Sequence, residues 1–519
     1  MSLNQCDDPI AEGSLAEPGG EIALAAGAEL AHEPTLTGIK EHPLREMVTI
    51  AAPTIATMTS YTVMQFIDAQ MVLRIGPEPV YVAAQGNGGM LAWLFIAIVL
   101  GMTGVVNSYV SQNLGAGRPR EGAAYAWNAM WISALGWAVL MVPMIFLCPM
   151  TFAALGHDDE LRRLEDDYAQ IMLFGGLFTT MARALGHYFY GMHRPVVVMV
   201  AVIAANLINV LANWILIFGH WGAPALGVAG AAIGTVLGTL VELVGPFLVF
   251  IGPRYAREFS TRVAWRPSLR HIRDIARIGW PGSLMFFNDM VCWGYLMVGL
   301  IPKAAQAAGQ DPVVANTAGW IGFRFMHLSF MPTVGLSIAL TAIVGKCMGM
   351  RRPDLAASRT WLGMRLGLAY MGLCAIAFFL FREQLVSLFI EKDTPPEART
   401  ALIAIGSQII IAAALFQLFD AIQILLSGAL RGAGDTIWPG ILTVVCSWTF
   451  IVAGGHLLIW RFPDLGAISP WIGGASFIIS LGCALLFRFT QGNWRTMRLV
   501  HDSDAGPDSA GPTSGLADA

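Results

Sequence analysis

The chain has 519 residues, of which 55% are hydrophobic and 13% are charged, and its formal net charge at pH 7 is −4. Soluble globular domains average about 25% charged residues, so this composition excludes an ordinary soluble fold. It predicts that lipid surrounds most of the chain, and a nucleic-acid partner is not expected.

Apolar stretches that are long enough to cross a membrane as helices recur along the whole chain. A hydrocarbon core of about 30 Å needs roughly 20 helical residues, and a backbone in lipid must satisfy its own hydrogen bonds. The stretches are too long and too uniformly apolar for barrel strands. The twelve predicted spans are 44–74, 83–113, 121–150, 164–192, 195–218, 226–252, 272–302, 313–348, 355–387, 397–431, 436–460 and 466–489.

The segment that leaves the second span recurs 234 residues later. Residues 101–127 and 335–361 are identical at seven of 27 positions, where chance would give roughly two. Six predicted spans separate the copies, and an even number returns the chain to the same side. The sequence therefore predicts two six-helix lobes in parallel orientation, an arrangement common among secondary transporters.

Basic residues in the connecting loops predict the orientation. The loops after even-numbered spans carry fourteen Arg and Lys residues, and the other loops carry eight. Because loops rich in Lys and Arg stay in the cytoplasm, both termini are predicted to be cytoplasmic. The protein is thus expected to be a multi-pass protein of the plasma membrane.

Polar breaks divide the chain into five predicted regions. A cytoplasmic linker at 253–271 holds the densest arginine cluster and separates an N-lobe at 44–252 from a C-lobe at 272–490. Tails at 1–43 and 491–519 are rich in small and acidic residues and cannot bury a core, so they are predicted to be disordered. No cleavable signal precedes the first span.

Motifs for the common enzyme classes are missing from the sequence. The one Gly-Lys pair, Gly345-Lys346, is followed by Cys347 rather than Ser or Thr, so the chain has no P-loop for ATP. Neither HExxH nor GxSxG occurs, and the cysteines show no metal-binding spacing. The chain is therefore predicted not to be an enzyme and to need no cofactor.

Three carboxylates lie alone inside predicted spans, where a charge is costly unless it faces a cavity, a partner or a proton. Asp68, Asp289 and Asp420 fall in the first, seventh and tenth spans. Asp420 shares one helical face with a row of polar residues, which comprises Gln417, Gln423 and Ser427. We expect these acids to bind a substrate cation or a coupling ion.

A structural role is the alternative for each acid. It could make a helix-helix hydrogen bond or a buried ion pair, and Arg324 in the next span is a plausible partner for Asp289. Glu242 is placed nearer the end of its span, where it could reach the interface, and is left out of the predicted site.

Further polar residues within the spans are candidates for lining a cavity. Asn206, Asn209 and Asn213 fall on one face of the fifth span, where they could equally make interhelical hydrogen bonds. His327 lies one turn from Arg324 in the eighth span, and it is either a packing residue or a proton relay.

Several segments resemble the multidrug and toxic compound extrusion (MATE) transporters, over about residues 44–490. The most specific match is the tenth span and its exit, from Phe419-Asp420 through Ser427-Gly428-Ala429-Leu430-Arg431-Gly432 to Asp435, which is similar to the bacterial NorM-like branch. The other matching segments are Phe66-Ile67-Asp68, residues 111–117, Asn209 and Asn213 before Ile217-Phe218-Gly219, and residues 226–232.

The resemblance implies an antiporter that expels organic, often cationic, compounds in exchange for H⁺ or Na⁺. Asp420 matches the carboxylate of the family's C-lobe cation site, which would hold Na⁺ if sodium is the coupling ion. Asp68 matches the first-span aspartate of the N-lobe protonation switch. Where NorM-like proteins have a seventh-span glutamate, this chain has Asn288 followed by Asp289. The expected setting is the bacterial inner membrane, with the protein as a monomer.

Two other functions stay open at this point. A flippase for a lipid-linked or amphipathic precursor would need several basic residues facing a phosphate, and the intramembrane candidates are Arg183, Arg324 and Arg365. A membrane enzyme acting on lipid would need a cluster of His or carboxylates at one membrane face, and the sequence shows none.

Overall fold

The fold is described from a computed structural model that covers residues 42–76, 80–390 and 395–500, and all regular structure in these ranges is helical. The first half of the fold contains α2 (Pro43–Val72), α3 (Val80–Thr103), α4 (Val106–Gly115), α5 (Pro119–Gly136), η1 (Trp137–Met141), α6 (Val142–Ala154), α7 (Asp159–Gly191), α8 (Pro195–Phe218), η2 (His220–Gly222) and α9 (Val228–Phe250). The short helix α10 (Pro253–Phe259) follows.

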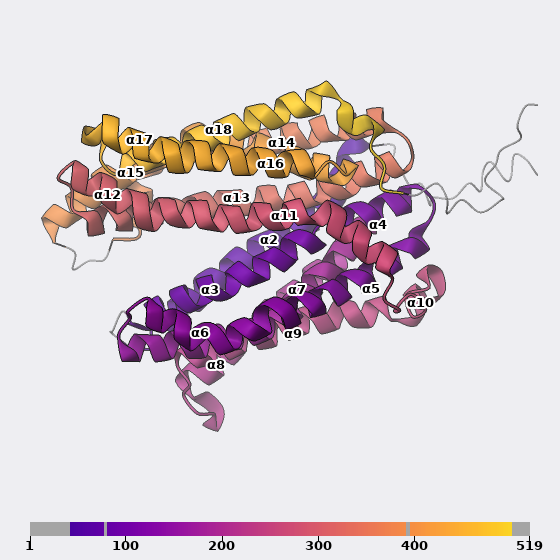
Figure 1. Cartoon of the computed structure of the whole chain (residues 1–519), viewed down its shortest axis with the longest axis horizontal. Helices are drawn as coiled ribbons and strands as arrows, with labels where there is room; N and C mark the ends of the chain where they lie inside the picture. Colours follow the sequence, from indigo (N-terminus) through magenta and orange to yellow (C-terminus); the bar gives the residue numbers. More distant parts are fainter. Residues whose placement is uncertain (1–41, 77–79, 391–394, 501–519) are drawn as a thin grey trace, which may run out of the picture. The chain divides into compact units, whose positions relative to one another are not determined.

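The second half contains α11 (Leu269–Tyr295), η3 (Leu296–Leu300), α12 (Ile301–Ala307), α13 (Pro312–Gly349), α14 (Pro353–Ser387), α15 (Pro396–Ala433), α16 (Ile437–Cys446), η4 (Ser447–Ala453), α17 (Gly454–Arg461), η5 (Pro463–Leu465), α18 (Ile468–Gln491) and η6 (Asn493–Thr496). Figure 1 shows the helices of the two halves as two groups, the first coloured indigo to magenta and the second coloured red to yellow.

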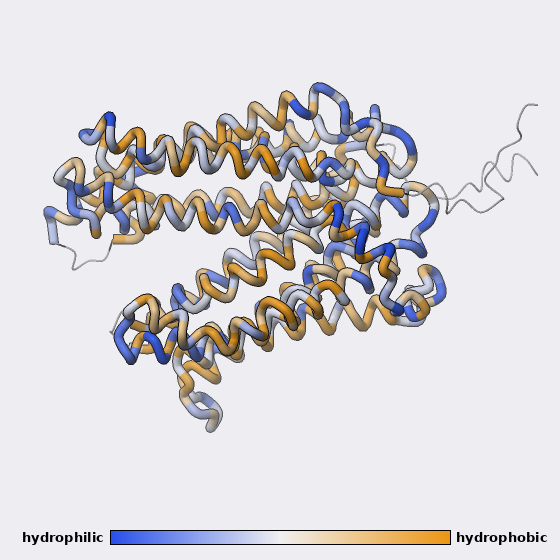
Figure 2. Tube along the Cα trace, in the orientation of Figure 1, coloured by the Kyte–Doolittle hydropathy of each residue, from blue (hydrophilic) through white to orange (hydrophobic). Residues whose placement is uncertain are grey.

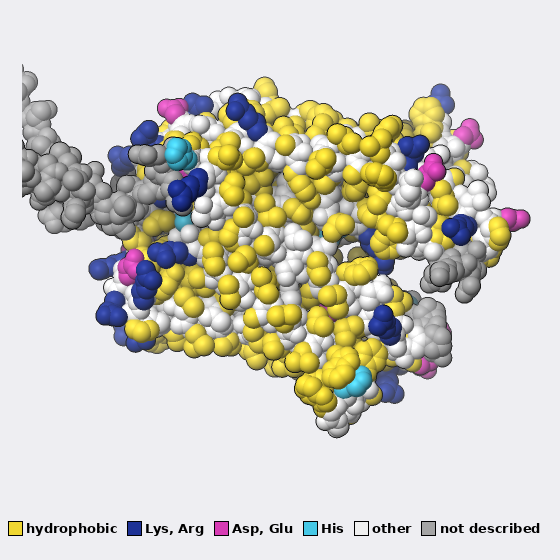
Figure 3. All heavy atoms as spheres, turned by 180° about the vertical axis from the view of Figure 1, so that it is seen from behind, with side chains coloured by type: hydrophobic (Ala, Val, Ile, Leu, Met, Phe, Trp, Pro, Cys, Tyr) yellow, Lys and Arg dark blue, Asp and Glu magenta, His cyan; other side chains and the backbone are white. Residues whose placement is uncertain are grey.

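Ten helical stretches in the described ranges are long and apolar enough to cross a membrane. The apolar residues run along the helices and polar residues concentrate at their ends (Figure 2). On the face shown in Figure 3, hydrophobic side chains cover the middle while charged side chains gather toward both ends. This distribution matches a hydrocarbon layer bounded by water, so the predicted all-helical membrane protein is confirmed.

Each predicted span coincides with a long helical stretch. The two spans outside the ten apolar stretches are α2 and α7, which have 30 and 33 residues and a lower apolar content. Polar residues inside these two helices, including Asp68 in α2 and Arg183 in α7, lower their hydropathy. The complete twelve-helix arrangement therefore stays a prediction.

Helix α2 belongs to the cores of both halves. Its beginning contributes Met47 and Ile50 to the hydrophobic core of the second half. Its middle contributes Met58 and Tyr61 to the core of the first half. Since successive turns of α2 bury apolar side chains against different halves, this helix ties the two halves together.

Hydrogen bonds join the halves where α4 meets the ends of α13 and α15. The Ser108 hydroxyl donates to the Arg431 carbonyl at 2.7 Å, and the Gln112 amide donates to the Gly432 carbonyl at 2.9 Å. A buried ion pair joins Glu46 of α2 to Arg359 of α14 at 3.0 Å. These contacts lie beside the loops that the charge pattern assigns to the cytoplasm.

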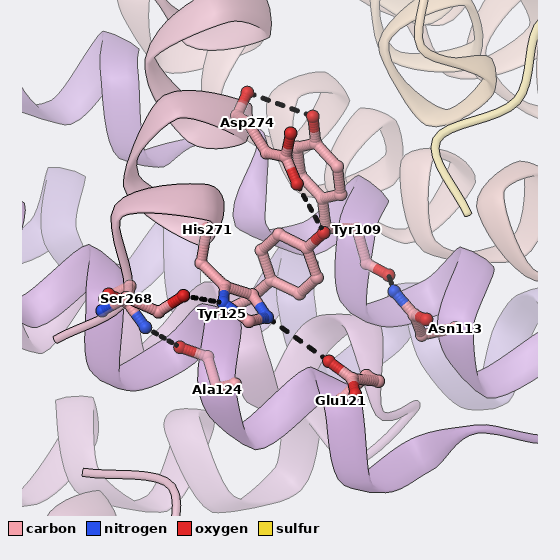
Figure 4. A network of polar contacts seen from close by, with 9 residues as sticks. Tyr109, Asn113, Glu121, Ala124, Tyr125, Ser268, His271 and Asp274 are labelled. Atoms are coloured by element: carbon pink, nitrogen blue, oxygen red, sulfur yellow. Dashed lines mark hydrogen bonds and ion pairs between the residues drawn. The ribbon is translucent and has the colours of Figure 1, made fainter. Parts of the chain in front are cut away.

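A polar network holds the start of α11 against α4 and α5 (Figure 4). The Tyr109 hydroxyl donates to the backbone carbonyl of Asp274 at 3.0 Å, and the Tyr125 hydroxyl donates to its carboxylate at 3.1 Å. His271 contacts the Glu121 carboxylate at 3.2 Å, and the Tyr109 and Tyr125 rings stack with centroids 4.4 Å apart. The two halves are thus linked by hydrogen bonds as well as by apolar packing.

The structure corrects the predicted limits of the linker and of the C-terminal tail. The linker region contains α10, and α11 begins at Leu269 rather than at 272. Residues 491–500, predicted to be disordered, are structured, because Trp494 stacks on Phe489 and the Leu499 amide donates to the Gln112 side chain at 3.0 Å. The other tail residues, 1–41 and 501–519, lie outside the described ranges.

The repeated glycines are explained by close contact between the halves. A Cβ atom on Gly115 would collide with the Lys346 backbone, and one on Gly349 would collide with the Gln112 backbone. In the same way Gly101 faces the Gly282 backbone. Gly115 in one copy of the duplicated segment thus packs against the other copy, and Gly349 does the same in return. Only glycine leaves enough space for these contacts.

The Gly115→Val substitution is expected to destabilise the fold, because the new side chain must displace the backbone of α13. Overpacking of this kind typically costs about 1–3 kcal/mol, and a backbone neighbour has little freedom to move. The thermal midpoint in detergent, followed by size-exclusion chromatography after heating, should fall clearly. Gly86→Val is the matched control, because a Cβ at that position would meet no atom of a neighbouring helix within 4 Å. Equal losses in both variants would contradict the explanation.

Candidate functional site

Asp68 lies among polar side chains from three helices of the first half. Only 7% of Asp68 is exposed, and its carboxylate accepts a hydrogen bond from the Asn213 amide of α8 at 2.7 Å. Asn209, one turn earlier, interacts with the same carboxylate and donates to the Thr235 hydroxyl of α9 at 3.3 Å. The structure thus assembles an Asp-Asn-Asn-Thr group, which we call the Asp68 group.

The Asp68 group offers several oxygen atoms to a small cation. Besides the Asp68 carboxylate and the Thr235 hydroxyl, the side-chain oxygen of Asn213 is buried and has no hydrogen-bond partner in the described residues. A hard cation such as Na⁺ prefers oxygen ligands of this kind, and a proton could instead neutralise the carboxylate. The third predicted asparagine, Asn206, does not join the group, because its amide donates to the Ser60 hydroxyl at 2.6 Å.

Asp420 lies in α15 of the second half, where only 4% of the residue is exposed. Its carboxylate accepts a hydrogen bond from the Gln423 amide at 2.9 Å, one turn along the same helix. Gln417 points elsewhere, donating to the Ser329 hydroxyl of α13 at 2.7 Å. Its side-chain oxygen is buried and unpaired among the described residues. The predicted polar row is therefore not one site, because Gln423 contacts Asp420 while Gln417 contacts Ser329.

Asn288 and Asp289 of α11 have different surroundings. The Asn288 amide donates to the Ser447 hydroxyl at 2.8 Å, and its oxygen accepts from the Trp448 indole at 3.0 Å, so Asn288 is held by η4. Asp289 has one buried carboxylate oxygen without a partner in the described residues. No ion pair to Arg324 forms there; Arg324 is exposed and lies over the Phe389 ring at 5.7 Å. The structure therefore does not support permanent pairing of Asp289.

His327 is partly buried between aromatic rings of α13. Its ring stacks with Phe323 and Phe330 at centroid distances of 6.4 and 6.2 Å. Its Nε2 atom is buried and has no hydrogen-bond partner in the described ranges. Stacking favours a packing role, while the unpaired nitrogen leaves a proton acceptor in the interior.

The three lone aspartates share one electrostatic property. Among the described residues, no Arg, Lys or His forms an ion pair with Asp68, Asp289 or Asp420, whereas Glu46 and Asp435 are each paired with an arginine within 3.0 Å. An unpaired carboxylate in a low-dielectric interior strongly attracts a mobile cation or a proton. Both halves therefore carry a buried acid that is chemically able to bind a cation or a proton.

Sequence reasoning missed two features of the first half. Thr235 carried no charge signal, and only the packing of α9 against α8 identifies it. Glu242, which had been placed near a helix end, is 5% exposed and accepts a hydrogen bond from the Tyr61 hydroxyl at 2.6 Å. Its neighbour Arg183 lies at 3.6 Å. The available signal was that Glu242 and Arg183 each lie eight residues before the C-terminal end of their helix.

The basic residues that a phosphate-binding flippase would need are not brought together. Arg183 contacts Glu242, Arg324 lies over Phe389, and Arg365 is an exposed residue of α14. Three arginines with separate surroundings cannot jointly hold one phosphate, so this geometry does not favour the flippase alternative.

Comparison with known proteins identifies the family. The MatE family model matches residues 53–215 and 307–454, one range in each half and together more than half of the chain. The chain belongs to the MatE family. This confirms the resemblance seen in the sequence, and it makes this MatE-family chain a membrane transporter rather than an enzyme.

Individual relatives cover nearly the whole MatE-family chain. It is 28% identical over 461 residues to the probable multidrug resistance protein NorM of Mesorhizobium japonicum, covering 86% of this chain and 94% of the relative. It is also 28% identical over 466 residues to the protein of the same name from Pseudomonas putida, covering 88% and 96%. Its fold is similar to a crystal structure of MATE in complex with MaL6, with a TM-score of 0.77, 20% identity and coverage of 89% and 97%.

Proposed function

We propose that the protein is a secondary active antiporter that exports organic, often cationic, compounds in exchange for H⁺ or Na⁺. The observation that carries this proposal is the buried aspartate in each half, Asp68 and Asp420, without a basic partner in the described residues. Membership of the MatE family and relatives named as multidrug resistance proteins support export as the direction.

In this proposal twelve transmembrane helices form two parallel six-helix lobes with both termini in the cytoplasm. The location is the bacterial inner membrane, and the protein acts as a monomer. The lobes correspond to the first and second halves, and the matched ranges of the family model, one in each half, support the duplication. The excess of basic residues on one side supports the orientation.

Ion exchange follows from the charge of the two acids. A deprotonated carboxylate binds an organic cation or Na⁺, and occupation by a proton or Na⁺ favours release of the organic cation. The Asp68 group supplies the larger set of oxygen atoms for a small ion, while a sodium site at Asp420 stays a prediction. Exchange becomes export only if ion binding favours one packing of the halves over the other.

The present packing of the halves fits a state that is closed toward the cytoplasm. The cross-half bonds of Ser108, Gln112 and Glu46 lie beside the predicted cytoplasmic loops. Figure 3 shows the surface hollowed between the halves at the opposite end. Breaking these bonds would be a necessary step toward the opposite state.

Transport in proteoliposomes tests the proposed function. A tenfold inward proton or sodium gradient supplies about 1.4 kcal/mol, so in a one-for-one exchange it is expected to drive ethidium to a concentration ratio of about tenfold across the vesicle membrane, whereas vesicles without a gradient should build up no such ratio. The rate under each gradient alone identifies the coupling ion. Vesicles treated with an ionophore that collapses the gradient, and vesicles without protein, are the controls. If neither gradient changes export, the antiporter proposal is wrong.

A further inference from the structure

A partly buried cation lies over an aromatic ring in the first half. The guanidinium carbon of Arg183, in α7, is 3.8 Å from the centroid of the Tyr61 ring of α2. The same guanidinium lies 3.6 Å from the Glu242 carboxylate of α9, measured from its Nε atom. The Tyr61 hydroxyl donates to that carboxylate oxygen at 2.6 Å. Tyr61 and Glu242 therefore form one preassembled surface, which we call the Tyr61–Glu242 pair.

This pair has the chemistry of an organic-cation site. An aromatic face attracts a flat or quaternary cation through its quadrupole, and a desolvated carboxylate adds charge attraction. The arginine satisfies both interactions at once. Its contact with Glu242 is loose, because 3.6 Å exceeds the usual length of about 2.7–2.9 Å for a hydrogen bond between charged groups. The Tyr61–Glu242 pair therefore contacts the guanidinium without a short hydrogen bond from its Nε atom to Glu242.

The Tyr61–Glu242 pair lies on the same two helices as Asp68 and Thr235, nearer the predicted cytoplasmic side. Tyr61 precedes Asp68 by seven residues in α2, and Glu242 follows Thr235 by seven residues in α9. Seven residues of helix correspond to about 10 Å. Because α2 and α9 run in opposite directions, both displacements point toward the predicted cytoplasmic side. The Asp68 group and the Tyr61–Glu242 pair therefore lie at two different depths in the membrane, both within the first half.

Arg183 is the accessible member of the three residues. Its side chain is 25% exposed, whereas that of Glu242 is 6% exposed and Tyr61 is 7% exposed. His187, one turn further along α7, interacts electrostatically with both Arg183 and Arg431 of α15, so this face of α7 looks toward the second half. Tyr190 of α7 is the other ionisable neighbour of Arg183 and Glu242. The arginine therefore covers the pair from the side that faces the other half.

We infer that the Tyr61–Glu242 pair is a binding subsite for an organic cation and that Arg183 occupies it as an internal competitor in this conformation. The inference rests on the proposed export of organic cations. A tethered guanidinium that re-enters the subsite would displace the exported cation and would keep Glu242 neutralised when no substrate is present. The arginine would then determine how tightly substrate is held and how readily it leaves.

Ethidium binding to the purified full-length protein tests the inference by fluorescence anisotropy. Arg183→Gln removes the competitor, so the dissociation constant of ethidium is expected to fall by about tenfold, which corresponds to the loss of one cation–π and charge interaction. Combining it with Glu242→Gln should cancel the gain. A purely structural role for Arg183 predicts the opposite, namely weaker binding or none.

Two further variants keep the test decisive. Arg183→Lys retains a charge for Glu242 but loses the planar group that stacks, so it should fold even if Arg183→Gln does not, and ethidium affinity should rise by about threefold. Arg365→Gln is the control for charge, because it removes one positive charge from an exposed position of another helix, and affinity should not change. An equal gain in Arg365→Gln, or no gain in either Arg183 variant, would overturn the inference.

The same measurements separate the inference from the proposed function. Tighter ethidium binding by Arg183→Gln together with gradient-independent transport by the natural chain would support the subsite and remove the antiporter proposal. Gradient-driven export by the natural chain with unchanged affinity in the Arg183 variants would support the antiporter proposal and remove the subsite.

Discussion

The Asp420→Asn variant is expected to lose gradient-driven ethidium export in proteoliposomes, with a fall of at least about tenfold. Asparagine keeps the size of the side chain and can still accept the hydrogen bond from Gln423, but it carries no charge for a cation and takes up no proton. Because Asp420 has no basic partner in the described residues, its neutral replacement leaves no charge unpaired, and the amount of folded protein in detergent should stay nearly constant.

Asp435→Asn is the contrasting control for Asp420. Asp435 is equally buried in the second half, but its carboxylate is bound to Arg488 at 2.9 Å. Removing its charge leaves Arg488, whose side chain is 11% exposed, without its partner. For a fully buried pair this typically costs about 3–5 kcal/mol, so stability should fall while export per folded molecule is kept. Transport at the natural rate in Asp420→Asn would remove that residue from the mechanism.

The Asp68→Asn variant is expected to lose ion coupling as well, again by at least about tenfold in gradient-driven export. Its carboxylate is the only charge of the Asp68 group, and without it the oxygen atoms of Asn209, Asn213 and Thr235 cannot hold a cation or a proton strongly. Counterflow of labelled substrate without a gradient should persist, since that exchange needs no ion. Comparing the two assays separates lost coupling from lost substrate binding.

Glu165→Gln serves as the matched control in the same half. Glu165 is fully buried, and its carboxylate accepts from the Asn87 amide at 2.7 Å and contacts His157 at 2.8 Å, so its partners are not those of the Asp68 group. Its replacement should leave coupling intact. Normal gradient-driven export in Asp68→Asn would confine coupling to Asp420 and the second half.

Much of the candidate site was visible before the fold was known, for a simple reason. A charge inside an apolar span is conspicuous, so Asp68, Asp289 and Asp420 could be chosen from one sequence. What a charge contacts depends on neighbours far away in the chain. Asp68 meets Asn213 across 145 residues, whereas Asp289 does not meet Arg324, although the two lie in consecutive spans.

The uncharged residues of the site show most clearly what the sequence alone cannot predict. Thr235 looks like an ordinary helix residue in the sequence, and its hydroxyl becomes part of the site only through the packing of α9 on α8. Glu242 and Arg183 were both noticed as residues, but no sequence pattern joins α7 to α2 and α9. Their relation to Tyr61 exists only in the packed fold.

The sequence by itself determined that this chain is helical and embedded in a membrane, because the length and apolarity of its segments leave a backbone in lipid no other way to satisfy its hydrogen bonds. The duplicated segment also indicated two related halves. Only the tertiary structure decided why Gly115 and Gly349 recur, which acids lack a basic partner and which cation covers Tyr61. These depend on side chains from distant helices meeting at distances of a few ångströms, and one-dimensional periodicity contains no information about such meetings.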